Sequence, residues 1–376
     1  MRGALSGKRV IVVLPSLELG GSERQALLLA RWLRDREGAE VQVWGKGPSG
    51  RASDLCDEAK LPWRAVEMEL RVGRWTLFWN LRRFAKLVRE ARADILLPYT
   101  TGPNVFCGAT WRKAGAKACV WNQRDEGRRL GVQAIDAKAA HNTPVLVSNS
   151  QHAADVVKEA LGVREVRVIH NGVELAPPLR DRADWRAQLK AGSGQFVATM
   201  VANVHGYKDH TTLIRAWRAV VDVLGSRAVL ALAGKPGDKQ AEVEALIVQF
   251  KLTGDVVLLG QVADVSGLLA ASDIGVFSSH KEGCPNGVLE CMAAGLAVAG
   301  TDIPGIREAV GDAGKPWLAP ENDDHVLSER IIALAQDVDA RKEAGEANRA
   351  RIAAEFSPEK MCRETVQAIK DSMNHE

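Results

Sequence analysis

Residues 278–290 read SSHKEGCPNGVLE, and this stretch predicts a turn between a strand and a helix. The apolar run before it, Ile274–Phe277, is short and bounded by turn residues, which indicates a buried strand. Residues 288–294 after it have the composition of a helix that Gly295 ends. Such a turn points backbone N–H groups and the positive end of a helix dipole at one place. It therefore predicts an anion-binding site.

Two carboxylates, Glu282 and Glu290, bracket this turn with seven residues between them. One precedes the turn amides and the other lies inside the helix, so they are placed to hold two parts of one ligand. A ligand that carries both anionic groups and hydroxyls, such as a nucleotide sugar, would use both features. The alternative is an ordinary strand-to-helix turn, in which Gly283 and Gly287 serve backbone geometry and both glutamates are solvated.

Longer segments around the turn resemble a known signature. EGCPNGVLECMAAG at 282–295, ASDIGVFSS at 271–279 and GTDIPGIREAV at 300–310 are similar to the motifs of the retaining glycosyltransferases of family 4 (glycosyl transferases group 1). The resemblance covers most of the second half and parts of the first. It implies an α/β GT-B fold, in which two Rossmann-like domains with parallel sheets face each other across a deep interdomain cleft.

Length and composition agree with a protein of this class. A chain of 376 residues exceeds what one hydrophobic core usually organises, so two domains are expected. The six cysteines are scattered without C-x-x-C spacing, which argues against a zinc site or a disulfide framework. We find no signal peptide and no uncharged apolar run long enough to cross a bilayer, and we expect a cytoplasmic protein.

The net charge of +3 is unevenly distributed. Residues 1–172 hold 28 Lys and Arg against 18 Asp and Glu, whereas the remainder holds 22 against 29. A basic first half suggests an anionic partner. We expect no nucleic acid, because no nucleic-acid-binding motif accompanies the charge.

The predicted helix at residues 75–90 combines Trp75, Phe78 and Trp79 with many basic residues. Such a helix is typical of peripheral contact with an anionic membrane, here at its inner face. The alternative, which the sequence slightly favours, is an apolar stripe facing the core with a solvated basic face.

The first half alternates strands and helices, which predicts a parallel sheet covered on both faces. The strands are expected at residues 10–14, 40–44, 63–66, 94–97, 117–121, 145–148 and 166–169, and helices at 75–90, 104–113 and 151–161. Ser22 is expected to cap an earlier helix. The loop before it lacks G-x-G-x-x-G, which argues against a dinucleotide. The resemblance implies that Gly20 and Gly21 face the donor phosphates and the acceptor, and a flexible turn is the alternative.

Acceptor-binding residues are expected where WNQRD, residues 121–125, ends a strand, because ligands of α/β sheets collect at strand carboxyl ends. Arg124 and Asp125 are the candidates. The histidine that many relatives carry near the reacting centre has no counterpart in this loop. Asp125 or Asn104 is a candidate for its role, unless the role is absent here.

The segment NVHGYKDH, residues 203–210, follows the first predicted strand of the second domain, 195–204. By resemblance, Lys208 matches a lysine that grips the donor diphosphate. Asn203 stands where relatives usually have an arginine, and Lys235 or Lys281 is a candidate to replace that charge.

The same resemblance implies the remaining donor contacts. Amides of Cys284, Asn286 and Gly287, with Lys208, would stabilise the charge that develops on the leaving diphosphate. Glu290 would accept hydrogen bonds from the ribose, and Glu282 would lie beside the donor sugar. Gln261 and Val262 would face the base, which leaves uracil and guanine undistinguished. No D-x-D pair is found in a suitable loop, so neither a metal nor a cofactor is expected.

The expected domains are residues 1–175, binding the acceptor, and 176–356, binding the donor, with a helix at 357–376 that packs back on the first domain. Pro177, Pro178 and the polar run to Gly194 are expected to be a linker. The predicted function is retaining transfer of a sugar from a UDP- or GDP-sugar to a glycan or lipid-linked acceptor, during surface polysaccharide or lipopolysaccharide assembly. A nucleotide-sugar epimerase of the same fold and a non-catalytic two-lobed binding protein are the alternatives. The sugar, the acceptor, the linkage and the oligomeric state are not predicted.

Overall fold

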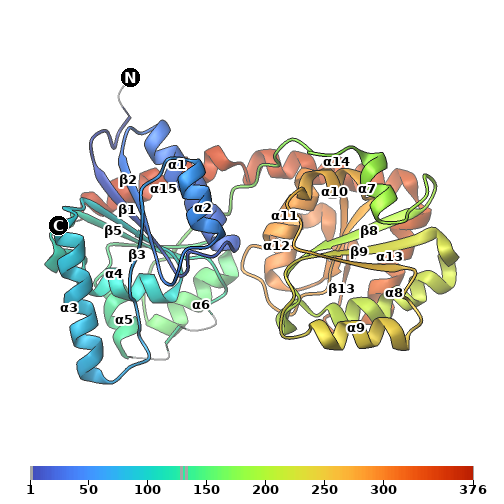
Figure 1. Ribbon diagram of the computed structural model, residues 1–376, viewed down its shortest axis with the longest axis horizontal. Coiled ribbons are helices and arrows are strands. Elements are labelled where there is room, and N and C mark those ends of the chain that lie inside the picture. The colour runs from blue at the N-terminus through green and yellow to red at the C-terminus, as the bar shows by residue number, and fades with distance from the viewer. Residues whose placement is uncertain (1–2, 128–129, 132–133, 376) are drawn as a thin grey trace. The chain divides into compact units, whose positions relative to one another are not determined.

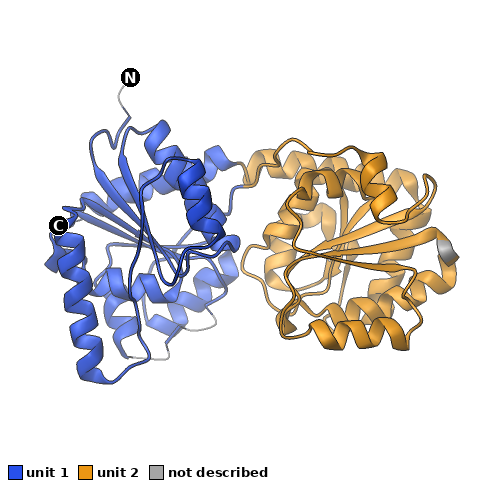
Figure 2. Cartoon of the chain, in the orientation of Figure 1, with its two compact units in different colours: residues 1–172, 358–376 blue, residues 173–357 orange. Residues whose placement is uncertain are grey.

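The computed structural model describes residues 3–127, 130–131 and 134–375. The chain divides into two compact units, coloured separately in Figure 2. Unit 1 comprises residues 1–172 together with the C-terminal residues 358–376, and unit 2 comprises residues 173–357. The boundaries expected from the sequence, after residues 175 and 356, lie close to these positions.

Unit 1 contains a seven-stranded parallel sheet in the order β3-β2-β1-β4-β5-β6-β7 (Figure 1). Its strands are β1 (Arg9–Leu14), β2 (Glu40–Gly45), β3 (Trp63–Ala65), β4 (Ile95–Pro98), β5 (Ala118–Gln123), β6 (Val145–Ser148) and β7 (Arg167–Val168). Its helices are α1 (Gly21–Asp35), α2 (Arg51–Glu58), α3 (Arg74–Glu90), α4 (Thr101–Ala114), α5 (Ala134–His141), α6 (Gln151–Leu161) and α15 (Pro358–Met373).

Unit 2 contains a six-stranded parallel sheet in the order β10-β9-β8-β11-β12-β13. Its strands are β8 (Phe196–Val201), β9 (Ala228–Ala233), β10 (Val256–Gly260), β11 (Ile274–Phe277), β12 (Ala297–Thr301) and β13 (Leu318–Ala319). Its α-helices are α7 (Arg182–Gln188), α8 (His210–Leu224), α9 (Gln240–Gln249), α10 (Val265–Ala271), α11 (Asn286–Ala293), α12 (Pro304–Gly314), α13 (Asp324–Gln336) and α14 (Val338–Glu355), and short 3-10 turns are η1 (Gly206–Lys208), η2 (Gly225–Arg227) and η3 (Lys315–Trp317).

Both faces of the unit 1 sheet are buried, which explains why its strands are apolar runs rather than alternating patterns. In β1, Val10 and Val12 belong to a core shared with α1 and α15, whereas Ile11 and Val13 belong to a second core with α3 and α4. Neighbouring side chains point to opposite faces of a strand, so one run supplies both cores. The expected fold of two Rossmann-like α/β domains is confirmed.

Helix α15 returns the chain to unit 1. Met361 and Ile369 lie in the core beside β1, and Ser372 Oγ exchanges hydrogen bonds with the backbone of Cys119 in β5, at 3.1 Å each way. Arg167 pairs with Asp371 at the same end of the helix. The last helix is thus fixed to the sheet of unit 1 by apolar and polar contacts.

Three local predictions are wrong. Helix α7 lies inside the expected linker, because Trp185 is buried and its Nε1 donates to Asp264 Oδ2 at 2.8 Å. Strand β8 ends at Val201, since residues 202–204 leave the sheet to form the following loop. Helix α1 begins at Gly21, so Ser22 does not cap it, and its hydroxyl donates to Glu23 instead.

The favoured prediction for α3, an apolar stripe that faces the core, is also wrong for its aromatic residues. Trp75, Phe78 and Trp79 are 77%, 44% and 63% exposed, and the helix buries Phe84 and Val88, farther along, instead. In the part of the chain that the structure describes, no helix is both long and apolar enough to cross a membrane.

Candidate functional site

Unit 2 has a topological switch point between its two central strands. From β8 the sheet grows outward through β9 and β10, and from its neighbour β11 it grows the other way through β12 and β13. Loops that follow the two strands at such a point diverge, and the crevice at their carboxyl ends is where ligands of α/β sheets bind. These loops are residues 202–209 and 278–285.

Lys208 and Glu282, one from each loop, form a nearly buried ion pair. Lys208 Nζ lies 2.5 Å from Glu282 Oε1, and the side chains are 17% and 9% exposed. Ser279 Oγ donates to the same oxygen at 2.8 Å. Among the residues whose placement is described, no other donor reaches Glu282, so its Oε2 and the remaining N–H groups of Lys208 are available to a ligand.

The two loops are fixed to each other by hydrogen bonds to their backbones. Ser278 Oγ donates to the carbonyl of Asp209 at 2.7 Å, and the N–H of His280 donates to the carbonyl of Tyr207 at 2.9 Å. Asp209 has a left-handed backbone, with φ of 48°, and its carboxylate caps α8 through the N–H of Thr212. Lys208 is therefore held at the end of a 3-10 turn against a rigid helix start.

The backbone around the Glu282 turn packs closely against α12 and the end of β8. A Cβ on Gly305, in the first turn of α12, would lie 2.3 Å from the Glu282 carbonyl oxygen, and one on Gly287 would lie 2.2 Å from that of Val201. Thr301 Oγ1 donates to the Ser279 carbonyl at 2.6 Å. Only glycine fits these two positions, because any larger residue would displace backbone.

Helix α11 begins directly after this turn, at Asn286. Its N-cap residue, Pro285, gives no side-chain hydrogen bond to the first-turn amides, which suits an anion at the helix start. Gly283 is buried, and Cys284, Asn286, Gly287 and Glu290 are half-buried around the same turn. All five predicted residues thus belong to one strand–turn–helix unit, as expected.

The loops after β8, β9 and β10 lie in a row. Asn203 Oδ1 accepts from the N–H of Lys235 at 2.9 Å, and the N–H of Gly234 donates to the Gly260 carbonyl at 2.8 Å. Gln261 and Val262 follow Gly260 directly. The structure therefore brings the backbone of Lys235, rather than Lys281, next to Asn203.

His210 is a residue of this region that the sequence did not single out. It is the first residue of α8 and is 2% exposed. Burial, and secondarily the charge of Lys208, lower the pKa of His210 to about 4. The imidazole is therefore neutral near pH 7, and Lys208 keeps the positive charge of this loop.

Unit 1 has its own switch point, between β1 and β4. Gly20 and Gly21 lie after β1, where Gly20 is the N-cap of α1. The buried carboxyl of Glu23 lies beside them, and burial raises its pKa. After β4, Thr100 has φ of 65° and ψ of 171°, a conformation that is essentially restricted to glycine. No sequence signal indicates this strained threonine.

The predicted acceptor residues make structural contacts within unit 1, and their role in binding the acceptor stays a prediction. Asn104 is fully buried and exchanges hydrogen bonds with the backbone of Asn122 at 3.0 and 3.1 Å. Arg124 is 7% exposed and donates to the Ile169 carbonyl at 2.9 Å. Only Asp125 is half-exposed, and its Oδ1 accepts from Gln123 and from the N–H of Gly127.

A metal-binding constellation is not found in residues 3–127, 130–131 and 134–375. No group of three or more His, Cys, Asp and Glu side chains in these ranges is arranged to hold an ion.

Comparison with known protein families finds a match for each of the two units. The model "Glycosyl transferases group 1" matches residues 181–351, and "Glycosyltransferase Family 4" matches residues 19–176. Among solved structures, Anabaena Alr3699/HepE in complex with UDP-glucose has a TM-score of 0.82 at 19% identity, covering 96% of this chain and 99% of that one.

Two curated relatives are similar over parts of the chain. N-acetyl-alpha-D-glucosaminyl L-malate synthase of Bacillus anthracis is 23% identical over 62% of this chain and 59% of its own length. O-antigen chain mannosyltransferase B of Escherichia coli is 29% identical over 47% of this chain and 46% of its own. The chain thus matches about three fifths or less of either relative. With one family model on each unit and a GT-B structure matched over nearly the whole chain, the protein belongs to the family 4 (group 1) glycosyltransferases.

Proposed function

We propose that the protein is a retaining glycosyltransferase that uses a UDP- or GDP-sugar and transfers the sugar to a glycan or lipid-linked acceptor. The observation that carries this proposal is the Lys208–Glu282 pair at the switch point of unit 2. This pair sets a cation and a carboxylate close to the start of α11. A nucleotide sugar bound there would present its diphosphate to the cation and its hydroxyls to the carboxylate.

Each group has a distinct task in the proposed reaction. The bond between the anomeric carbon and the diphosphate oxygen breaks, and a bond from the acceptor hydroxyl oxygen forms on the same face of the sugar. The hydroxyl proton passes to the departing phosphate oxygen. Lys208 and the amides that open α11 stabilise the charge that develops on the diphosphate, a contribution of about 3 kcal/mol per preorganised donor. No metal ion is required in this scheme.

Glu282 is proposed to orient the donor sugar. One of its oxygens accepts hydrogen bonds from Ser279 and Lys208, so the other would accept one from a ligand hydroxyl. Glu290 would receive the ribose hydroxyls, and Gln261 and Val262 would face the base. Lys235 would supply the positive charge that Asn203 lacks, because backbone contacts hold it beside that residue.

The acceptor is proposed to bind unit 1 near Gly20, Gly21 and Asp125. Relatives include an O-antigen chain mannosyltransferase, which supports a role in surface polysaccharide or lipopolysaccharide assembly. The exposed Trp75 and Trp79 of α3 support peripheral contact with the inner face of an anionic membrane. Co-sedimentation with phosphatidylglycerol vesicles tests this contact, and a protein that stays in solution contradicts it.

The transfer itself is tested by nucleotide release. We expect nucleoside diphosphate to accumulate from one UDP- or GDP-sugar only when an acceptor extract is supplied, and the product anomer to keep the donor configuration by NMR. Lys208→Ala and Glu282→Ala should each reduce the rate about 100-fold or more with folding retained by circular dichroism. Release without acceptor, an inverted product, or full activity in either variant would contradict the proposal.

A further inference from the structure

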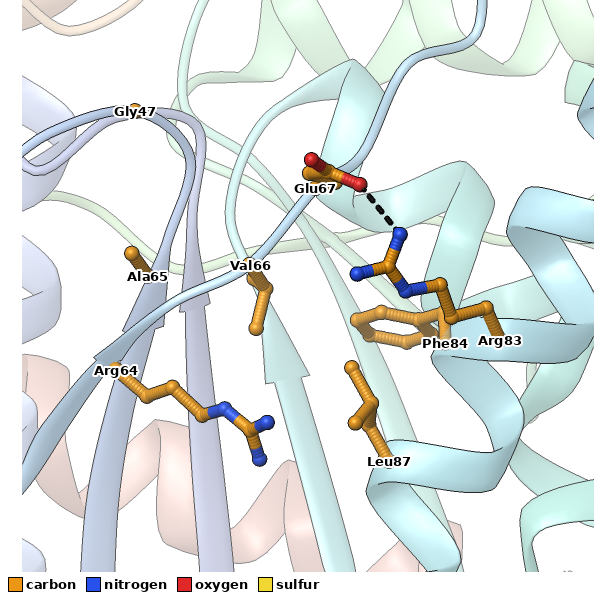
Figure 3. A pocket seen from close by; sticks show the side chains of 8 residues that line it. All are labelled: Gly47, Arg64, Ala65, Val66, Glu67, Arg83, Phe84 and Leu87. Atoms are coloured by element: carbon orange, nitrogen blue, oxygen red, sulfur yellow. Dashed lines mark hydrogen bonds and ion pairs between the residues drawn. The ribbon is translucent and has the colours of Figure 1, made fainter.

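Unit 1 has a pocket of about 410 Å³ that none of the proposed donor or acceptor residues lines. It lies between the loops that follow β2 and β3 on one side and α3 on the other (Figure 3). Gly47 marks the loop after β2, Arg64 and Val66 mark β3 and the residues after it, and Phe84 belongs to α3. The outer strand pair of the sheet, rather than the switch point, forms this cavity.

Two arginines point toward the pocket from opposite walls. Figure 3 shows Arg64 reaching in from the β3 side and Arg83 from α3. The Arg64 guanidinium lies 5.7 Å from the centre of the Trp44 ring, which positions it without neutralising it. Within the described ranges, Arg64 makes no ion pair. Its charge is therefore available to an occupant of the pocket.

The second arginine has a partner that is easily exchanged. Arg83 Nη1 lies 2.7 Å from Glu67 Oε2, but the side chains are 69% and 78% exposed. Exposed pairs of this kind contribute very little free energy, so a ligand anion competes for Arg83 at little cost. Val66 and Phe84, which also line the pocket, are buried and apolar.

We propose that this pocket binds an organic phosphate. The phosphate group would lie between Arg64 and Arg83, whose planar guanidinium groups match its oxygens in pairs. The carbon-bearing substituent would lie over Val66 and Phe84, since small-molecule sites combine an apolar lining with a few directed polar groups. Glu67 would give up Arg83 when the ligand binds.

The phosphate has two possible sources with the same chemistry, a soluble phosphorylated compound or a lipid headgroup. The exposed Trp75 and Trp79 on the same helix place an interfacial surface about one to two turns from Arg83, which fits a headgroup. Neither source depends on transfer activity, so this inference and the proposed transfer reaction fail independently.

The test measures binding to the whole protein without any nucleotide sugar. One arm titrates glycerol 3-phosphate by calorimetry, with glycerol as the blank, and the other measures flotation with phosphatidylcholine vesicles with and without phosphatidylglycerol. Arg64→Gln and Arg83→Gln should each weaken the responding arm about 10-fold or more, because each removes a charge-assisted hydrogen-bond donor. Glu67→Gln should strengthen it, because Arg83 is then unpaired.

Two control variants remove a positive charge without touching the pocket. Arg36 also lies 5.7 Å from a tryptophan ring, that of Trp32, and Lys86 sits on α3 beside Glu90 at 3.8 Å. Arg36→Gln and Lys86→Gln should bind as the wild type does. A response in the first arm assigns a soluble phosphate, and a response in the vesicle arm alone assigns a lipid headgroup. No response in either arm would overturn the proposal. So would a response that the two pocket variants and the two control variants weaken equally.

Discussion

His210 shows how a single buried side chain supports the proposed donor site. It directly follows Asp209, which caps α8, and lies two residues after Lys208. Its pKa of about 4 means that the folded protein resists a proton that the unfolded chain, with a pKa near 6.5, accepts. The protein therefore avoids a second positive charge close to Lys208 at neutral pH.

This shift predicts a pH dependence of stability with a definite sign. Between pH 6.5 and about 4 the unfolded chain binds more protons at this position, so the free energy of unfolding falls as the pH falls. The loss reaches about 3 kcal/mol at the acid end of the window. Denaturant unfolding of wild type and His210→Asn across this range should show a steeper decline in the wild type.

The exposed His152 provides the control for that comparison. His152→Gln should unfold with the same pH dependence as the wild type. Equal slopes for wild type and His210→Asn would show that the folded state accommodates a charged imidazole at this position.

Some residues of the proposed site can be predicted from the sequence and others cannot, for physical reasons. Glu282 and Glu290 are recognisable because they bracket a turn whose glycines and proline have strong local preferences. The ion pair between Lys208 and Glu282 joins residues far apart in the chain, which no local pattern reveals. Asn104 and Arg124 are predicted to bind the acceptor, and the structure adds that both donate to buried backbone carbonyls, a need that becomes visible only in three dimensions.

At the scale of elements, α12 acts as the support of the Glu282 turn. Its first turn approaches the turn so closely that Gly305 has no room for a side chain. Any residue larger than glycine must move either the helix or the turn, and the turn carries the carboxylate that pairs with Lys208.

We therefore expect Gly305→Ala to weaken donor binding and to lower stability. Overpacking of this kind costs about 1–3 kcal/mol, and displacement of Glu282 should reduce the transfer rate further. Gly102→Ala is the matched control, since Gly102 also lies in the first turn of a helix and a Cβ there meets nothing within 4 Å. If Gly305→Ala keeps the melting temperature and the donor affinity of the wild type, α12 does not support the Glu282 turn in the way proposed.

Elements buried in a parallel sheet were the most predictable part of the fold. The strands Ile274–Phe277 and Val145–Ser148 have the expected bounds, because a run buried on both faces must be continuously apolar. Helix α7 was missed, since it is short and polar apart from Trp185, whose burial depends on α10. The aromatic residues of α3 misled the prediction because helical spacing alone does not distinguish a core-facing stripe from an exposed one.

Over the whole molecule, the same topological rule applies twice. Each unit grows outward in two directions from a central strand pair, β1 and β4 in one and β8 and β11 in the other. The alternation of strands and helices in the sequence predicts this architecture, and the loops at the two switch points carry most of the proposed site. In unit 2 the switch point combines the Lys208–Glu282 pair with the start of α11, which is why the donor is proposed to bind there.

Calorimetric titration of the whole protein with a panel of UDP- and GDP-sugars tests this central claim most directly. We predict that one class of donor binds the wild type without added metal, and that Lys208→Ala weakens binding about 10-fold or more while Lys281→Ala changes it little. Lys281 lies on the same turn as Glu282 but is exposed, so it controls for loss of charge. Undiminished donor binding by Lys208→Ala, or no binding of any nucleotide sugar to the wild type, would contradict the account.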